Sequence, residues 1–428
     1  MTEKLLQYIW QFQYFNRTHL HTTNNEKVEV IFAGTLNKNQ GPDFTNAQIK
    51  IGGTLLVGAV ELHLKTSQWE QHGHTNDANY QNVVLHVVFE HDKELPHALP
   101  VLALHPHIPK MLLHYYQSLM NGARLIPCAG NIHLVKDITW MAWKERLLAE
   151  RLTRKSTQVL QFLQQTNHHW EETFWWLLAR NFGIKVNADA FEAMARSISI
   201  NILAKHKNSI HQLEALLLGQ ANLLSASFSE DYPLLLQREY RFLQSKYGLH
   251  PSAITVHFLR MRPGNFPTLR LAQLAMLIHQ SSHLFSKVLE TASLKEVQQW
   301  LNVTANDYWH YHYRLNEPAA FKKKRMGAAM IDNIVINTIV PVLFAYGLYH
   351  KDEQYKAKAL HWLEETAAED NSVINEFTQL SITNASAFDS QALIELKNEY
   401  CHHKRCLECA VGNSILAHPF PASGGTQV

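Results

Sequence analysis

The N-terminus of the chain lacks the uninterrupted apolar core of a signal peptide, because residues 1–4 lead into a segment that includes Gln7 and Gln11. A clean membrane-spanning segment is also missing. The most apolar long window, residues 328–346, contains Asp332 and Pro341, which are costly in hydrocarbon but ordinary in a buried helix pair. We therefore expect a soluble, cytoplasmic protein with no membrane partner.

A strong charge of either sign is absent as well. The formal net charge is +2, and charged residues make up 18% of the 428 residues, which is compatible with a nucleic-acid partner but does not indicate one. No repeat of fixed period is present, which argues against a regular solenoid. The length favours two or three domains, and the 27 histidines raise the chance of metal chemistry without locating it.

The first part of the chain has β-strand character after an opening helix. Helical spacing of apolar residues predicts a helix over residues 2–15. Short β-branched runs separated by turn residues then predict strands over residues 28–32, 47–51, 55–64, 83–90 and 101–104. Gly52-Gly53 is a tight hairpin signal between the second and third of these strands.

From Met111 onward the pattern becomes helical, with long runs over residues 140–163, 171–182, 209–218 and 269–284. The predicted fold is α+β: a mixed sheet with flanking helices, then a large all-helical domain closed by a C-terminal cysteine metal site. The corresponding limits are 1–125 for the β-rich domain, 126–399 for the helical domain, 400–416 for the cysteine segment and 417–428 for a disordered tail.

The strand over residues 55–64 carries chemistry on one face. Side chains alternate along a strand, so Glu61, His63 and Lys65 share one side while apolar residues share the other. Asp43 lies just before the preceding strand, and the hairpin between the two strands brings it toward Glu61. Two carboxylates with an imidazole form an oxygen-rich set suited to Mg²⁺ or Mn²⁺.

Pro42-Asp43 and Glu61-Leu62-His63 resemble the first and second motifs of the PD-(D/E)XK nuclease superfamily. That resemblance implies a core of a helix, three strands, a helix and a strand. It also implies that Asp43 and Glu61 hold the catalytic metal. The superfamily's lysine, two residues after the second acid, is replaced here by His63. Either His63 or Lys65 is then the expected general base.

The residues around these motifs are more distinctive than the nuclease pattern. They include Gly34, Asn37, Trp69 and Tyr80. On this run, together with the cysteines, the whole chain is identified as a member of an uncharacterised bacterial family of unknown function. Within the run, His72 and His74 with Asp77 behind them are expected to position substrate or transfer protons, and secondarily to ligate a transition metal.

All four cysteines are expected to form one site. Cys128 follows the β-rich domain, and Cys401, Cys406 and Cys409 form a C-x4-C-x2-C cluster. In a cytoplasmic protein this spacing favours a metal over disulfides. Four thiolates suit either zinc or an iron–sulfur cluster. A distal cysteine with a C-terminal triplet is similar to certain helicase-nucleases and CRISPR-associated exonucleases that hold an iron–sulfur cluster, although their spacings run in the reverse order.

Three arginines surround a Pro/Gly-rich turn that opens a helix, namely Arg260, Arg262 and Arg270. Arginines beside a helix N-terminus can hold a phosphate. A buried polar loop, in which they bond carbonyls and carboxylates, is the alternative.

The preferred hypothesis is a metal-dependent phosphodiesterase of the nuclease type acting on DNA or RNA. One alternative is a non-catalytic nucleic-acid-binding or scaffold protein with a degenerate nuclease fold, since loss of the lysine is also what degeneration produces. The other is a metal hydrolase for a different substrate, using His72, His74 and Asp77. Protein partners are not indicated.

Overall fold

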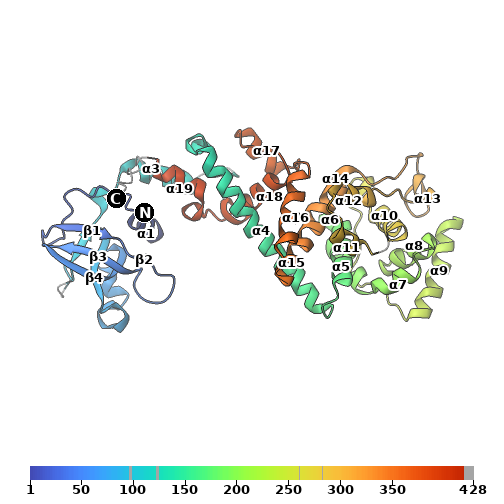
Figure 1. Cartoon of the computed structure of the whole chain (residues 1–428), viewed down its shortest axis with the longest axis horizontal. Helices are drawn as coiled ribbons and strands as arrows, with labels where there is room; N and C mark the ends of the chain where they lie inside the picture. Colours follow the sequence, from blue (N-terminus) through green and yellow to red (C-terminus); the bar gives the residue numbers. More distant parts are fainter. Residues whose placement is uncertain (96–98, 122–124, 260, 282, 419–428) are drawn as a thin grey trace. The chain divides into compact units, whose positions relative to one another are not determined.

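The computed structural model describes residues 1–428 except 96–98, 122–124, 260, 282 and 419–428. Its contacts divide the chain into two compact units (Figure 1). The first comprises Met1–Glu145 and Glu395–Val428, and the second comprises Arg146–Ile394. The C-terminal cysteine segment therefore belongs to the same unit as the sheet. The predicted disordered tail lies, from residue 419 onward, outside the described residues.

The first unit is built on a mixed sheet, which confirms the predicted α+β class. Its strand order is β1-β3-β4-β5-β6, with β2 also paired to β3. The β1, β3 and β4 strands are antiparallel, whereas β4, β5 and β6 are parallel. The bounds are α1 Glu3–Gln11, β1 Val28–Phe32, β2 Thr35–Leu36, β3 Phe44–Ile51, β4 Thr54–Lys65, β5 Val83–Glu90 and β6 Val101–Ala103.

Local turn chemistry sets the ends of these elements. Gly52 and Gly53 have positive φ angles of 57° and 95° and form the predicted hairpin turn, in which Ile51 pairs with Thr54. The opening helix ends at Gln11, before the predicted residue 15. Gln13 adopts a positive φ of 52°, which a right-handed helix does not allow.

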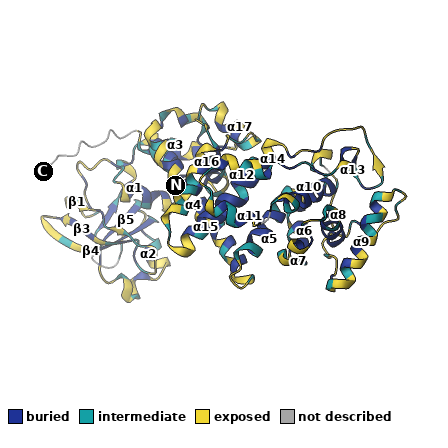
Figure 2. Ribbon diagram, turned by 45° about the vertical axis from the view of Figure 1, so that its right-hand side comes forward, coloured by how far each residue is buried: buried dark blue, intermediate teal, exposed yellow. Residues whose placement is uncertain are grey.

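The central strand β4 is buried on both faces, although the sequence predicted one apolar and one chemical face. Every residue from Gly58 to His63 is buried, whereas its hairpin end is exposed (Figure 2). Trp69, in the segment after β4, packs with Ala59 and Val83 in one hydrophobic cluster. The chemical side chains therefore lie in the interior of the unit, where their electrostatic interactions are strengthened.

Short helices and the C-terminal segment complete the first unit. The last helix, α19, packs on α3 (Figure 1). The bounds are α2 Gln68–Gln71, η1 His74–Asn76, η2 Ala78–Tyr80, η3 His105–His107, α3 Lys110–Asn121, η4 Ala129–Leu134, η7 Leu396–Cys401, η8 Cys406–Glu408 and α19 Ala410–Ala417. Helix α4, Asp137–Gln165, begins in this unit and continues into the second.

The second unit is helical, as predicted, with the addition of a two-stranded ribbon, β7 His312–Arg314 with β8 Glu317–Pro318. Its other helical elements are α5 Trp170–Phe182, α6 Ile184–Arg196, α7 Ile200–Lys205, α8 Ile210–Gln220, α9 Asp231–Tyr247, η5 Pro263–Asn265, α10 Pro267–Gln280, α11 Leu284–Glu290, α12 Leu294–Leu301, α13 Asp307–His310, α14 Ala328–Ile334, η6 Val335–Ile339, α15 Val340–His350, α16 Glu353–Glu365, α17 Ser372–Gln379 and α18 Ala387–Glu395.

One helical stretch of this unit, Ala328–His350, is long and apolar enough to cross a membrane. Two thirds of its most apolar window, 67%, is buried inside the protein. This burial is that of a helix in the core of the unit.

Candidate metal centre

A closed loop before β3 presents Asp43. Gly41 adopts a φ of 108°, which strongly favours glycine and turns the chain into Pro42. The side-chain Nδ2 of Asn37 donates to the backbone carbonyl of Pro42 at 3.0 Å. The backbone N–H of Asn37 donates to the backbone carbonyl of Asp43 at 2.7 Å. The Gly-Pro-Asp motif is therefore a rigid turn that fixes the start of β3.

Asp43 and Glu61 are brought together, as predicted. The Asp43 amide donates to Glu61 Oε2 at 2.9 Å, and the Leu62 amide donates to Asp43 Oδ2 at 3.1 Å. Burial raises the pKa of Asp43 to about 6. Burial, followed by the charge of Asp43, raises the pKa of Glu61 to about 8. Two carboxyls in this setting resist ionising together unless a cation joins them.

A histidine loop covers these acids. Gly73, between His72 and His74, has a φ of 75° and lets the loop turn sharply between the two imidazoles. Trp69 anchors the loop by donating from Nε1 to Thr75 Oγ1 at 3.2 Å. The ring of Tyr80 stacks on His74 with centroids 3.8 Å apart. The loop is thus held over β4 by packing.

Three imidazoles converge beside Glu61. His63, His72 and His74 each offer a ligand atom, and these atoms all lie within 4.8 Å of one another. His63 Nε2 lies 3.1 Å from His72 Nδ1, while His74 Nε2 is buried with no hydrogen-bond partner. A buried ring nitrogen without a partner is costly, so this atom points to a ligand.

The distances to Glu61 fit a shared cation better than ion pairs. Glu61 Oε1 lies 3.5 Å from His63 Nε2 and 3.6 Å from His74 Nε2, at or beyond the limit of a hydrogen bond. Ligand atoms bound at 2.0–2.2 Å to one tetrahedral metal lie about 3.4 Å apart. Glu61 Oε1 is therefore spaced from His63 and His74 as two ligands of one metal are spaced. Together with His72, these side chains are named here the histidine–glutamate cluster, and they are the residues that could hold a divalent transition metal.

His63 is in the neutral form that ligation requires. Burial first, and then the charges of His86, His72 and His74, lower its pKa to about 3. Its Nδ1 shares a hydrogen bond of 2.9 Å with His86 Nε2 on β5. If His63 donates this bond, a lone pair remains on Nε2, facing the cluster, which is the usual arrangement for a metal-bound histidine. Such a low pKa makes His63 a poor general base near neutrality.

Helix α1 contributes residues that sequence reasoning missed. Gln7 Nε2 donates to Asp43 Oδ1 at 2.8 Å. Glu3 lies one turn earlier, and its charge adds to the raised pKa of both Asp43 and Glu61. The only signal was the i, i+4 spacing of Glu3 and Gln7 on an amphipathic helix. His86 was also missed, since it stands alone in an apolar strand.

Lys65 and Asp77 are placed differently from the cluster. Lys65 is exposed. Its charge acts on Asp92. Burial raises the pKa of Asp92, but hydrogen bonds from Ser67 and the charge of Lys65 lower it overall. Asp77 caps η2, accepting from the Asn79 amide at 2.9 Å. Its charge also acts on His74, so it supports the histidine loop.

The predicted arginines belong to the second unit. Arg260 lies outside the described residues, and Arg262 is exposed. Arg270 is buried, and its guanidinium donates to Gln273 Oε1 at 2.9 Å and to Asn265 Oδ1 at 2.6 Å. Burial lowers its pKa to about 10. Arg270 therefore makes the bonds of the predicted buried polar loop.

The four cysteines meet in the first unit. All are buried and unbridged, and together they line one small pocket. They are named here the cysteine cluster. Burial raises the pKa of Cys406 to about 12, and burial followed by neighbouring thiol charges raises the pKa of Cys128.

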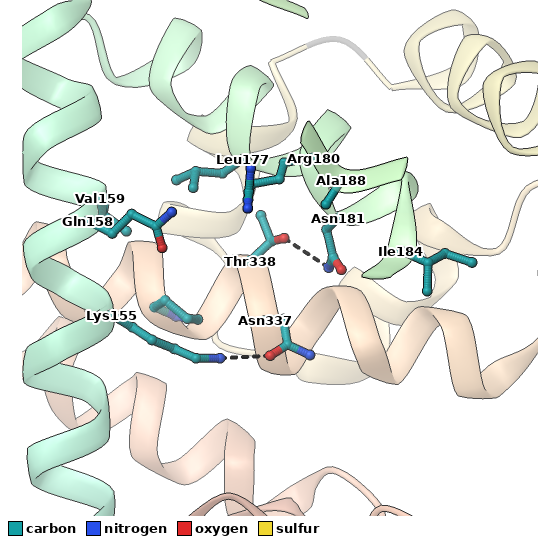
Figure 3. A pocket seen from close by; sticks show the side chains of 11 residues that line it. Lys155, Gln158, Val159, Leu177, Arg180, Asn181, Ile184, Ala188, Asn337 and Thr338 are labelled. Atoms are coloured by element: carbon teal, nitrogen blue, oxygen red, sulfur yellow. Dashed lines mark hydrogen bonds between the residues drawn. The ribbon is translucent and has the colours of Figure 1, made fainter. Parts of the chain in front are cut away.

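The second unit holds a polar pocket of about 200 Å³ between α4, α5 and the helical turn η6 (Figure 3). Its polar groups bond one another. Lys155 Nζ donates to Asn337 Oδ1 at 2.7 Å, and Asn181 Nδ2 donates to Thr338 Oγ1 at 3.0 Å. No residue predicted to be functional lines this pocket.

Comparisons with known proteins identify a family without adding an activity. No curated protein and no solved structure matches the chain. A family model matches residues 3–372, most of the sequence. The chain with this histidine–glutamate cluster therefore belongs to the family described as Protein of unknown function (DUF2851).

Proposed function

We propose that the first unit is a metal-dependent phosphodiesterase that cleaves nucleic acid. The observation that carries the proposal is the histidine–glutamate cluster, in which Glu61 Oε1 lies 3.5 and 3.6 Å from two imidazole nitrogens, with Asp43 beside it. The order α1, β1, β2, β3, β4, α2 and β5 supports the proposal, because it contains a helix, three strands, a helix and a strand once the two-residue β2 is set aside.

The metal in this proposal is a transition ion. Three imidazoles suit Zn²⁺ or Fe²⁺, whereas Mg²⁺ prefers oxygen ligands. Mn²⁺ accepts both carboxylate and imidazole ligands. It is therefore the ion that suits both the three histidines and the metal-dependent chemistry expected from the two acids. When bound, such an ion lowers the pKa of a water molecule and offsets the charge that develops on a phosphate.

The side chains divide the remaining work. Glu61 and the three histidines hold the ion, and His86 orients His63 through their shared hydrogen bond. Asp43 is half-buried, and Gln7 and the Leu62 amide hold its two oxygens. With a pKa of about 6, Asp43 is the better matched group to take a proton from the attacking water.

Labelled single- and double-stranded DNA and RNA, incubated with the full chain and Mn²⁺, Zn²⁺ or Mg²⁺, test this function. We expect Mn²⁺-dependent cleavage by wild type, and a loss of at least about a hundredfold in Glu61→Gln, His74→Ala and Asp43→Asn. Glu90→Gln, an exposed carboxylate on β5, is the matched control and should cleave like wild type.

The remaining outcomes separate the alternatives. Equal cleavage by all variants would reveal a contaminating nuclease. Metal binding at the cluster without cleavage of any nucleic acid would move the activity to another substrate, such as an ester or amide. Absence of both metal binding and cleavage would favour the non-catalytic scaffold.

A further inference from the structure

The cysteine cluster is separate in sequence and chemistry from the histidine–glutamate cluster. Cys128 precedes η4, Cys401 ends η7, Cys406 begins η8, and Cys409 is the residue before α19. Each of these cysteine residues is between 6% and 9% exposed. Four buried thiols from separate turns do not meet by chance, and none of them forms a disulfide. They therefore form a ligand set.

Burial raises the pKa of the Cys409 thiol, and hydrogen bonds to its sulfur act against that rise. Backbone amides of Val411 and Gly412 and the side chain of Trp143 form hydrogen bonds to its sulfur. These two amides belong to the first turn of α19, whose N-terminus carries partial positive charge. Donors directed at a sulfur stabilise it as an anionic ligand and tune the metal that it holds.

Local packing is built around the cluster. A Cβ atom at Gly412 would lie 2.2 Å from the carbonyl oxygen of Cys406, so only glycine lets α19 approach η8 this closely. Arg405 bonds Glu408 and the Glu399 carbonyl and stacks over Tyr400. It thereby holds the loop between Cys401 and Cys406. Leu396, Tyr400 and Val411 supply an apolar wall.

The sulfur spacing distinguishes two kinds of metal site. Among the described residues, three ligand atoms lie within 4.8 Å of one another only in the group His63, His72 and His74. No three of the described cysteines form such a group, although all four line one pocket. The sulfurs of a tetrahedral zinc site, bound at 2.3 Å, lie about 3.8 Å apart. A cubane cluster binds each cysteine at a separate iron corner and so requires a wider cage.

We propose that the cysteine cluster holds a [4Fe–4S] centre that fastens the C-terminal segment to the rest of the first unit. The whole second unit, Arg146–Ile394, lies in sequence between Cys128 and Cys401. Such a centre ties two distant parts of the chain into one compact body. His402 and His403 are exposed, and neither lines the pocket, so the ligand set is all cysteine.

Metal analysis of full-length protein purified without oxygen tests this assignment. We expect brown protein with about four iron and four acid-labile sulfide per chain. Cys128→Ser and Cys406→Ser should each lose most of the sulfide and visible absorption. The double variant His402→Ala/His403→Ala is the matched control and should retain both. Limited proteolysis should cleave residues 395–417 faster in the cysteine variants than in this control.

The variant His74→Ala distinguishes iron bound at the histidine–glutamate cluster from iron bound at the cysteine cluster. It should leave the sulfide content and the colour unchanged. If the cysteine variants fail to fold, wild-type protein can be stripped of metal by chelation instead. Adding back either iron with sulfide or zinc then shows which of the two the cysteine cluster holds. Recovery of proteolytic resistance with iron and sulfide supports the proposal. Colourless protein with stoichiometric zinc, or full resistance without any metal, would overturn it whatever the outcome of the nuclease assays.

Discussion

Two buried glutamates, Glu61 in the first unit and Glu214 in the second, have a pKa that burial raises to about 8. Glu214 accepts from Tyr232, Asn306 and Trp309, so three donors compensate its buried carboxyl. Glu61 accepts one backbone amide and faces imidazole nitrogens at 3.5 and 3.6 Å. A raised pKa thus accompanies both a structural and a candidate functional site, and the neighbouring donors distinguish them.

The largest expected effect is on stability, and it comes from removing Glu214, whose carboxyl accepts three hydrogen bonds. Glu214→Ala leaves a cavity and three donors without their acceptor, and each orphaned donor costs about 1–3 kcal/mol. We expect the free energy of unfolding of the second unit to fall by about 3 kcal/mol or more, measured by denaturant titration. Glu61→Ala should cost the first unit much less. Equal losses would remove the distinction between the two glutamates.

Metal affinity should depend on Glu61 and not on Glu214, the opposite of the pattern expected for stability. Removing a ligand by Glu61→Gln or His74→Ala should weaken Mn²⁺ or Zn²⁺ binding by at least about a hundredfold, because even outer partners contribute ten- to a hundredfold. Isothermal titration and the rise of melting temperature with metal report this. Glu214→Gln serves as the control, and a comparable loss in that variant would contradict the assignment.

The pH dependence of stability follows from the two raised pKa values. Between the ordinary value of 4.5 and about 8, the unfolded state has lost a proton that the folded state keeps. Raising the pH through this window therefore lowers metal-free stability, by up to about 1.4 kcal/mol per pH unit for each group. Urea unfolding at several pH values should show a flatter dependence in Glu61→Gln for the first unit and in Glu214→Gln for the second. An unchanged slope in either variant would mean that the glutamate ionises normally.

A smaller effect is expected at the turn that presents Asp43. Gly41→Ala meets no close atom, but its φ of 108° strains any other residue by about 1–3 kcal/mol. We expect a loss of about 1 kcal/mol in stability together with weaker activity. Gly130→Ala, where φ is not positive and space is open, controls for the added methyl group in the same unit.

The smallest effect is expected at Lys65, which stands one pleat beyond the position that the nuclease lysine occupies. Because Lys65 is exposed and its charge acts on Asp92, Lys65→Ala should change metal affinity and the cleavage rate less than about twofold. A rate loss as large as that of Asp43→Asn would make Lys65 the general base.

The sequence by itself determined the hairpin of β3 and β4 and the approach of its two acids. Short β-branched runs and the Gly52-Gly53 turn predicted this hairpin, which the structure shows with Ile51 opposite Thr54, and the hairpin brings Asp43 to Glu61. Both signals are local, since they depend on residues within a few positions of one another.

Only the tertiary structure decided what surrounds those acids. Glu3 and Gln7 reach the site because α1 packs against β4, and His86 reaches His63 because β5 lies parallel to β4. The sequence predicted His63 or Lys65 as the general base, whereas burial beneath the histidine loop lowers the pKa of His63 and holds it neutral. Burial and long-range packing set the local dielectric and the partners of each group, and neither can be derived from the spacing of residues along one strand.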